Sequence, residues 1–218
     1  AQSLGLKLTD SQIRIAVGLR LGCKLCQKHV CSCGKPVDEF GLHGLSCQRS
    51  AGRFGRHSIL KSIVKQALSS VHVPSVLEPP GLNRTDGKRP DGMTQMPWSK
   101  GCPMVWDVTV VDGLAPSRVL RNIEAGDAAE TRKERKYQQI SDAGYIFQPI
   151  AFETQGSCGP STKTFFKLLW KKLETATTEP RSLTFLRQRI SVAIQIGNAA
   201  FVLGTIRDCD KLEDVYYI

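Results

Sequence analysis

Two aspartates in this chain have the surroundings expected of ligands for a divalent metal ion. Asp107 interrupts a run of apolar and β-branched residues at 104–111. Such a run predicts a buried strand, where a carboxylate is costly unless it has a partner. Asp91 lies in a Pro-Asp-Gly sequence that predicts a turn. Mg²⁺ is a suitable partner for both acids, because it takes oxygen ligands that usually include one or two protein carboxylates.

The basic group of such a site is expected on a helix. No lysine stands two residues after Asp107, so the amine must come from a later element. Lys133 and Tyr137 are four residues apart and share one face of a helix predicted at 125–143, and Lys136 is the neighbouring alternative. A lysine here would orient an attacking water and stabilise negative charge, as phosphodiester cleavage requires.

These residues also have structural interpretations. Asp91 could cap a turn, and Lys133 and Lys136 could belong to a solvent-exposed helix face with Glu130 and Glu134. The carboxylate within the apolar strand is the hardest to explain in this way.

Two further acids have open roles. Glu153 ends a strand predicted at 145–153, where it either adds to the metal site or faces solvent. Glu78 follows a strand predicted at 73–77 and would at most support the metal ligands indirectly.

Clustered cysteines predict a second metal site near the N-terminus. Five of the eight cysteines fall within the first fifty residues, interleaved with two histidines, which favours zinc over disulfide bonds. The tightest set has the spacing C-x-C-x9-H-x3-C and consists of Cys31, Cys33, His43 and Cys47. It matches a closed tetrahedral site. Its one-residue first gap is short for zinc, so ligands drawn from Cys23, Cys26 or His29 stay open.

Charge favours a polyanionic partner. Lys and Arg number 30 against 20 Asp and Glu, for a net charge of +10. The first seventy residues hold eleven basic side chains and three acidic ones. Nucleic acid is the simplest partner for such a chain, and a basic surface that serves only solubility is the alternative.

The expected elements form an α/β core. Helices are predicted at 9–21, 57–70, 125–143 and 161–175, and strands at 73–77, 89–95, 104–111 and 145–153. An apolar segment at 183–206 is expected to cover the sheet. The chain then divides into an N-terminal helix and zinc module (1–50), a core (51–178) and a C-terminal helical extension (179–218).

The sequence predicts a soluble, intracellular protein with no membrane partner. It contains no apolar stretch of the roughly 18 residues needed to span a bilayer, and no secretion signal at the N-terminus. The chain begins with Ala1 rather than Met, so we expect it to be a piece of a longer protein.

Taken in order, these motifs resemble the restriction-like endonuclease domain of site-specific non-LTR retrotransposons. The resemblance covers roughly residues 20–155. It consists of the CCHC motif, a Gly-Arg-Phe-Gly-Arg-His element at 52–57, the Arg-Pro-Asp sequence at 89–91, the strand with its aspartate, and a helical lysine followed by tyrosine. That family is a variant of the PD-(D/E)xK nucleases.

The resemblance implies a fold, cofactors and residue roles. The fold is a restriction-endonuclease-like core, a central mixed sheet flanked by helices. Asp91 and Asp107 match the acids that bind catalytic Mg²⁺, Lys133 matches the catalytic lysine, and Tyr137 matches the trailing tyrosine. The ligands of a structural Zn²⁺ are Cys31, Cys33, His43 and Cys47.

It also implies an activity. Such domains lie C-terminal to a reverse transcriptase in one polyprotein and nick target DNA, whose freed 3′ hydroxyl primes reverse transcription. The partners would be DNA, the element RNA and the reverse transcriptase domain, and the location nuclear. The residues expected to contact nucleic acid are Arg53, Arg56, His57 and Arg89, although His57 could equally pack at a helix start.

Two other functions stay open. A structure-specific nuclease that resolves DNA junctions would use the same core. A catalytically inactive, zinc-dependent nucleic-acid-binding module would keep the core only as a scaffold.

Overall fold

The computed structural model describes residues 7–47, 49–50, 52–82, 89–113 and 124–206. The side chains at 52–54 lie outside this description. The chain divides into two compact units, one made of residues 1–58 and 189–218 and the other of residues 59–188. Both boundaries fall within helices, α3 (Gly52–Ser69) and α8 (Ser182–Leu203). The predicted division at 50 and 178 stays a prediction.

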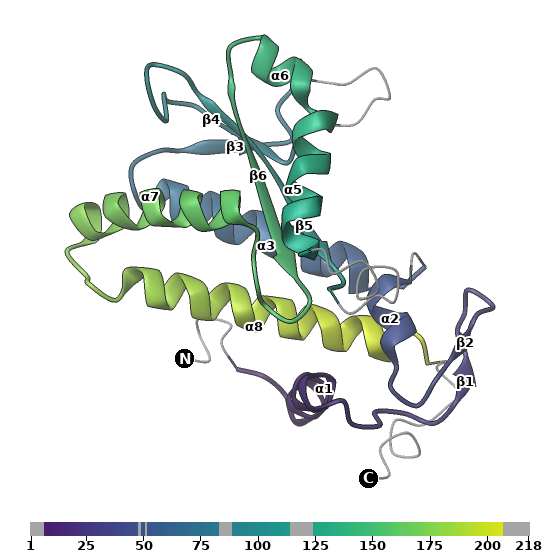
Figure 1. Cartoon of the computed structure of the whole chain (residues 1–218). Coiled ribbons are helices and arrows are strands. Elements are labelled where there is room, and N and C mark those ends of the chain that lie inside the picture. The colour runs from purple at the N-terminus through teal and green to yellow at the C-terminus, as the bar shows by residue number, and fades with distance from the viewer. Residues whose placement is uncertain (1–6, 48, 51, 83–88, 114–123, 207–218) are drawn as a thin grey trace. The chain divides into compact units, whose positions relative to one another are not determined.

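The second unit is built on a mixed four-stranded sheet flanked by helices (Figure 1). Its strands, in their order across the sheet, are β3 (Ser75–Leu77), β4 (Gly92–Thr94), β5 (Met104–Val111) and β6 (Ile146–Glu153). β4 is antiparallel to both of its neighbours, β3 and β5, and β6 is parallel to β5. Helices α5 (Ala125–Lys136) and α7 (Pro160–Thr177) both contact β6. The predicted α/β class and mixed sheet are confirmed.

Close packing between β4 and β5 explains the glycine after Asp91. The predicted Pro-Asp-Gly turn is wrong, because Gly92 is the first residue of β4 and pairs with Trp106. The Trp106 side chain is fully buried, and a Cβ at Gly92 would come within 2.2 Å of the indole. Glycine is therefore needed here to make room for the tryptophan.

A helix predicted at 125–143 is in fact two helices. α5 ends at Lys136, and α6 (Gln138–Asp142) begins after Tyr137, whose backbone (φ −114°, ψ 24°) departs from helical values. The Tyr137 ring is 1% exposed and packs on Phe147, with the ring centroids 4.9 Å apart. The break thus coincides with a residue that is anchored in the core.

The first unit surrounds a separate apolar core. It contains α1 (Asp10–Leu21), a hairpin of β1 (His29–Val30) and β2 (Pro36–Val37), the short helix α2 (Leu42–Ser46), and the second part of α8. A capping box between Thr9 and Gln12 starts α1. The core residues are Ile15, Leu19, Leu25, Leu45, Ala199 and Val202.

The C-terminal helix contributes to the core of the first unit through Ala199 and Val202. The expectation that the segment at 183–206 covers the sheet stays a prediction. Neither α8 nor any other helix in the described residues is long and apolar enough to cross a membrane.

Candidate functional site

The second unit brings together the residues predicted to act on a phosphodiester. Asp107 lies in the middle of β5, and its carboxylate accepts hydrogen bonds from the Lys133 ammonium and from the Tyr137 hydroxyl, the latter at 3.1 Å. Asp91 immediately precedes β4, and its Oδ2 accepts the backbone N–H of Val108 at 2.7 Å. Antiparallel pairing of β4 with β5 therefore places the two acids at neighbouring positions, although fifteen residues separate them in sequence.

Both acids are buried, which makes their charges costly. Asp91 is 6% exposed and Asp107 is 3% exposed. Burial raises the pKa of Asp107; the Lys133 charge opposes this shift, and the nearby Asp91 carboxylate adds to it. A divalent cation between the two carboxylates would relieve both the desolvation and the repulsion. These hard oxygen donors therefore fit a hard cation such as Mg²⁺.

Lys133 and Lys136 have different contacts. The Lys133 ammonium contacts the Asp107 carboxylate directly. The Lys136 ammonium lies 3.2 Å from the Tyr137 hydroxyl and 4.7 Å from the centroid of its ring. That hydroxyl is also 3.2 Å from the Arg89 carbonyl oxygen. The contacts favour Lys133 as the basic group of the site and give Lys136 a place beside the tyrosine.

A third lysine joins the site without a signal in the sequence. The Lys61 ammonium, on α3, lies 2.8 Å from Oε1 of Glu78 and 3.7 Å from Oδ1 of Asp91. Glu78 follows β3, and its backbone N–H donates to the Asp91 carbonyl at 3.0 Å. Nothing in the spacing connects Lys61 with an acid thirty residues later, and the pairing of β3 with β4 that brings Glu78 to Asp91 is equally absent from the local sequence.

Two further acids, Glu130 and Glu153, accept hydrogen bonds from backbone N–H groups at the starts of helices. Glu130 is 2% exposed and accepts the N–H groups of Ser161 (2.9 Å) and Thr162 (2.8 Å) at the start of α7. It therefore does not belong to a solvent-exposed face with Glu134. Glu153 accepts the N–H of Gly126 at 2.9 Å, in the first turn of α5. This role is neither of the two predicted for it, and it suits the positive end of a helix.

A second site lies in the first unit, where four predicted metal ligands meet. The ligand atoms of Cys31, Cys33, His43 and Cys47 all lie within 4.8 Å of one another. Cys31 Sγ is 3.7 Å from Cys47 Sγ, and Cys33 Sγ is 3.2 Å from His43 Nε2. Three thiols and one imidazole are typical of structural zinc sites, so this cluster can bind zinc.

Local structure explains how the short cysteine spacing works. Cys31 and Cys33 lie in the tight turn between β1 and β2, which is closed by a hydrogen bond from the Cys31 N–H to the Lys35 carbonyl at 2.9 Å. His43 lies in α2, and Cys47 caps the C-terminus of that helix one turn later. A hairpin turn and a helical turn thus each supply two ligands.

The thiols of the cluster do not ionise alike. Burial by itself raises the pKa of Cys31, but hydrogen bonds from the Cys33 backbone and the His43 ring outweigh it and lower the pKa to about 6. Burial raises the pKa of Cys47, and the Cys31 and Cys33 thiols add to that shift. The Cys31 thiolate therefore forms more readily than that of Cys47, and a bound cation would favour the Cys47 thiolate.

The alternative ligands have other partners. The Cys26 thiol donates to the Asp38 carbonyl at 3.3 Å, and burial raises its pKa to about 11. His29 Nε2 is 3.0 Å from the Thr205 hydroxyl, and its Nδ1 is 2.9 Å from the Gln27 carbonyl. Cys23 is likewise outside the cluster that the described residues form.

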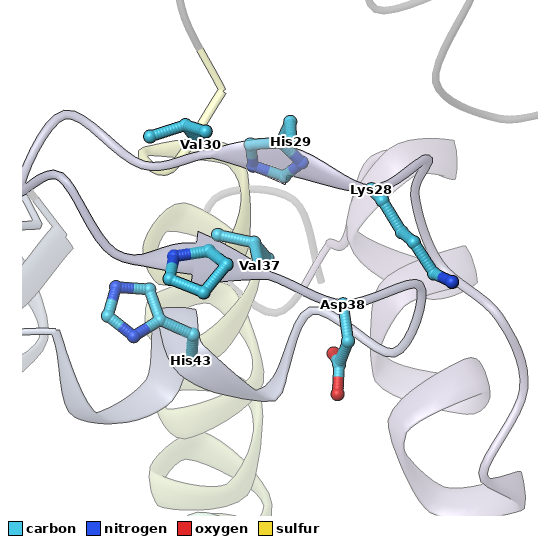
Figure 2. A pocket seen from close by; sticks show the side chains of 7 residues that line it. Lys28, His29, Val30, Val37, Asp38 and His43 are labelled. Carbon is cyan, nitrogen blue, oxygen red and sulfur yellow. The ribbon is translucent and has the colours of Figure 1, made fainter.

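A hollow adjoins the cluster on the side of His43 (Figure 2). Its lining consists of Lys28, His29, Val30, Pro36, Val37, Asp38 and His43. The charges of Lys28 and Asp38 oppose each other, so the hollow does not single out an anionic ligand.

The residues predicted to contact nucleic acid differ in their burial. Arg56 is 7% exposed; its Nη1 donates to Asn198 Oδ1 at 2.7 Å, and its guanidinium lies 4.2 Å from the centroid of the Phe201 ring. It is thus part of the first unit's interior, which argues against a phosphate contact. Arg89 is exposed beside Asp91, and His57 is half-buried. The side chain of Arg53 lies outside the described residues.

No protein-family model matches the chain, and a search of the curated proteins found no match.

Proposed function

We propose that this chain is a Mg²⁺-dependent DNA endonuclease with a zinc-binding N-terminal module. One observation carries the proposal: Asp91, Asp107, Lys133 and Tyr137 meet in the second unit, with both acids buried. The described elements from α3 to β6 follow the order helix, three strands, two helices, strand. That order supports the PD-(D/E)xK type of core that the sequence motifs resemble.

The acids supply the metal-binding part of the site. Mg²⁺ held by Asp91 and Asp107 would activate a water molecule and neutralise charge on the scissile phosphate and on the leaving oxygen. The hydrogen bond from Val108 fixes one oxygen of Asp91, and the Tyr137 hydroxyl orients Asp107. Both carboxylates are therefore held in place before a substrate arrives.

Lys133 supplies a positive charge at the edge of the site. Its ammonium contacts Asp107 and its side chain is 21% exposed, so it can reach a water or a phosphate oxygen at the edge of the site. A positioned ammonium stabilises the negative charge that develops as the phosphodiester breaks. The exposed Arg89 lies two residues before Asp91 in the sequence, and we assign it a contact with a neighbouring phosphate.

We further propose, from the order of the motifs, that the enzyme is the nuclease domain of a retroelement polyprotein. It would nick DNA in the nucleus and leave a 3′ hydroxyl for an attached reverse transcriptase that copies the element RNA. The net charge of +10 supports a nucleic-acid partner.

A plasmid-nicking assay tests this proposal. Zinc-loaded protein is incubated with supercoiled DNA with and without Mg²⁺, and the products are offered to a DNA polymerase. We expect Mg²⁺-dependent open circles that the polymerase extends, because a 3′ hydroxyl is left. A folded protein that binds the plasmid and leaves it intact would support the inactive binding module, and a strong preference for four-way junctions would support the junction-resolving alternative.

A further inference from the structure

Each acid of the candidate nuclease site is paired with its own lysine. Lys133 contacts Asp107, and Lys61 lies 3.7 Å from Oδ1 of Asp91. The second lysine is also shared, because Glu78 Oε1 lies 2.8 Å from the same ammonium. The mechanism above uses the first lysine and gives no role to the second.

The Lys61 side chain is largely shielded from solvent, and its ammonium lies between two acids of the site. The Lys61 side chain is 13% exposed, whereas the Glu78 side chain is 59% exposed. The fold keeps Glu78 beside Asp91 at some cost, because Glu78 has a φ of 49° in the left-handed region that non-glycine residues rarely adopt. A backbone hydrogen bond of 3.0 Å from Glu78 to Asp91 helps to hold it there. The two carboxylates thus bracket one buried cation.

We propose that Lys61 takes the place of a second divalent ion and restricts the site to one metal ion, bound by Asp91 and Asp107. This inference rests on the proposed function. Phosphodiesterases with two metal ions hold them about 3.5–4 Å apart and need acids around each. Among the described residues, the acids that contact Lys61 and could hold a second ion are Asp91 and Glu78, whose oxygens already flank the ammonium.

Size and charge prevent the ammonium and a second ion from sharing this space. Mg²⁺ requires its oxygen ligands at about 2.0–2.1 Å, so it would have to sit between the same two carboxylates. An ammonium and a divalent cation placed between the same two carboxylates would lie close together and repel each other strongly. Lys61 is therefore a positioning residue that neutralises Asp91 and Glu78 without being exchanged during turnover.

Counting bound Mn²⁺ by electron paramagnetic resonance tests this inference without requiring activity. Zinc-loaded wild-type protein is expected to bind one Mn²⁺, and Asp107→Asn is expected to bind none. Lys61→Met should bind two, because its uncharged side chain frees the Asp91 and Glu78 carboxylates. Adding Glu78→Gln to Lys61→Met should return the count to one.

Two control variants separate charge from packing. Lys65→Met removes a lysine one turn later on α3, which has none of the acid contacts of Lys61 among the described residues, and should leave the count at one. Lys61→Arg keeps the charge and should also bind one ion. The dependence of nicking on Mn²⁺ concentration adds a kinetic measure: it should be hyperbolic in the wild type and sigmoidal in Lys61→Met.

The possible results have distinct meanings. Two ions in the wild type, or one ion in Lys61→Met, would overturn the role of Lys61 while leaving the nuclease proposal in place. No bound Mn²⁺ in the wild type would overturn both. One ion in the wild type supports the inference, and two in a folded Lys61→Met variant would establish it.

Discussion

The proposed metal site needs Asp107 as an ionised carboxylate, whereas its burial makes the ionised form unfavourable for the stability of the fold. It is 3% exposed, and burial raises its pKa, with Lys133 opposing and Asp91 adding to the shift. The folded state therefore holds the Asp107 proton more tightly than the unfolded state does. The stabilisation that this provides is complete below the unfolded value of 3.8 and is lost as the pH rises through the higher folded pKa.

Replacing this carboxylate with an amide should therefore stabilise the protein at neutral pH. We expect the free energy of unfolding of Asp107→Asn, relative to wild type, to increase as the pH rises from about 4 to 7 in Mg²⁺-free buffer. Urea denaturation at several pH values measures it. Asp142→Asn, an exposed aspartate on α6, serves as the matched control and should follow the wild type. A drop in stability of Asp107→Asn that grows with pH would contradict the argument.

The two candidate lysines can be separated by their contacts. Lys133 touches the metal-binding Asp107, whereas Lys136 touches the Tyr137 hydroxyl. Lys133→Met should lower the nicking rate by about 10²–10³, as loss of a positioned charge-stabilising group does. Lys136→Met should lower it by less than about tenfold, since we assign this lysine to the support of Tyr137, whose hydroxyl lies 3.2 Å from its ammonium. Single-turnover nicking at saturating Mg²⁺ measures both; a reversed order would transfer the catalytic role to Lys136.

Single residues were predictable where a side chain conflicts with its sequence surroundings. A carboxylate in an apolar strand identified Asp107, and thiols interleaved with histidines identified the four-residue cluster. Arg56 was predicted to contact nucleic acid, and its burial against Asn198, 142 residues later, could not be read from the local sequence. The Lys61 side chain does not conflict with its sequence surroundings, so nothing in the sequence was a reason to place it in the site.

Two acidic caps fix the helix that carries Lys133. Glu130, one turn before Lys133, accepts three hydrogen bonds at the start of α7, and Glu153 accepts one from the start of α5. A side chain at Gly159 would collide with the Glu130 carboxylate, so the two helices approach closely here. These contacts set where α5 lies relative to β5 and β6, and hence where the lysine meets Asp107.

Weakening the first cap should lower stability. Glu130→Gln leaves one side-chain NH₂ facing backbone N–H donors, so we expect a loss of about 1–3 kcal/mol in the free energy of unfolding. Glu134→Gln makes the same change on an exposed position of the same helix and should stay within about 0.5 kcal/mol of the wild type. Urea denaturation compares the two. Equal effects would mean that the cap contributes nothing to holding α5.

Elements were predictable from sequence where apolar periodicity was unbroken. The strands at β5 and β6 and the helices at α1 and α7 follow the expected ranges closely. The break between α5 and α6 was missed, because no glycine or proline marks it in the sequence and only the buried contacts of Tyr137 explain it. The short β3 and β4 are set by pairing with neighbours, which a local pattern does not contain.

At the scale of the whole molecule, each unit has its own means of stabilisation. The second unit has a sheet with buried apolar strands. The first unit has a small apolar core and four metal-ligating side chains. Small segments of this kind commonly depend on their metal to fold, since the binding free energy of zinc becomes folding free energy.

Removing zinc should therefore affect the two units unequally. We expect about one zinc per chain, and we expect a chelator to increase hydrogen exchange in the amides of residues 23–50 far more than in β5 and β6. His43→Ala should act like the chelator. Cys23→Ala changes a cysteine outside the cluster and should retain the zinc. Uniform protection after chelation would show that the metal is not structural.

The central claim is that Asp91 and Asp107 form a cleavage site that is separate from DNA binding. The most direct test measures nicking and DNA affinity in parallel for wild type, Asp91→Asn, Asp107→Asn and the exposed control Asp142→Asn, all zinc-loaded. The account predicts that both site variants lose nicking by at least about 10³ while their affinity for DNA and its salt dependence stay near those of the wild type. Undiminished nicking by folded Asp91→Asn and Asp107→Asn proteins would contradict it.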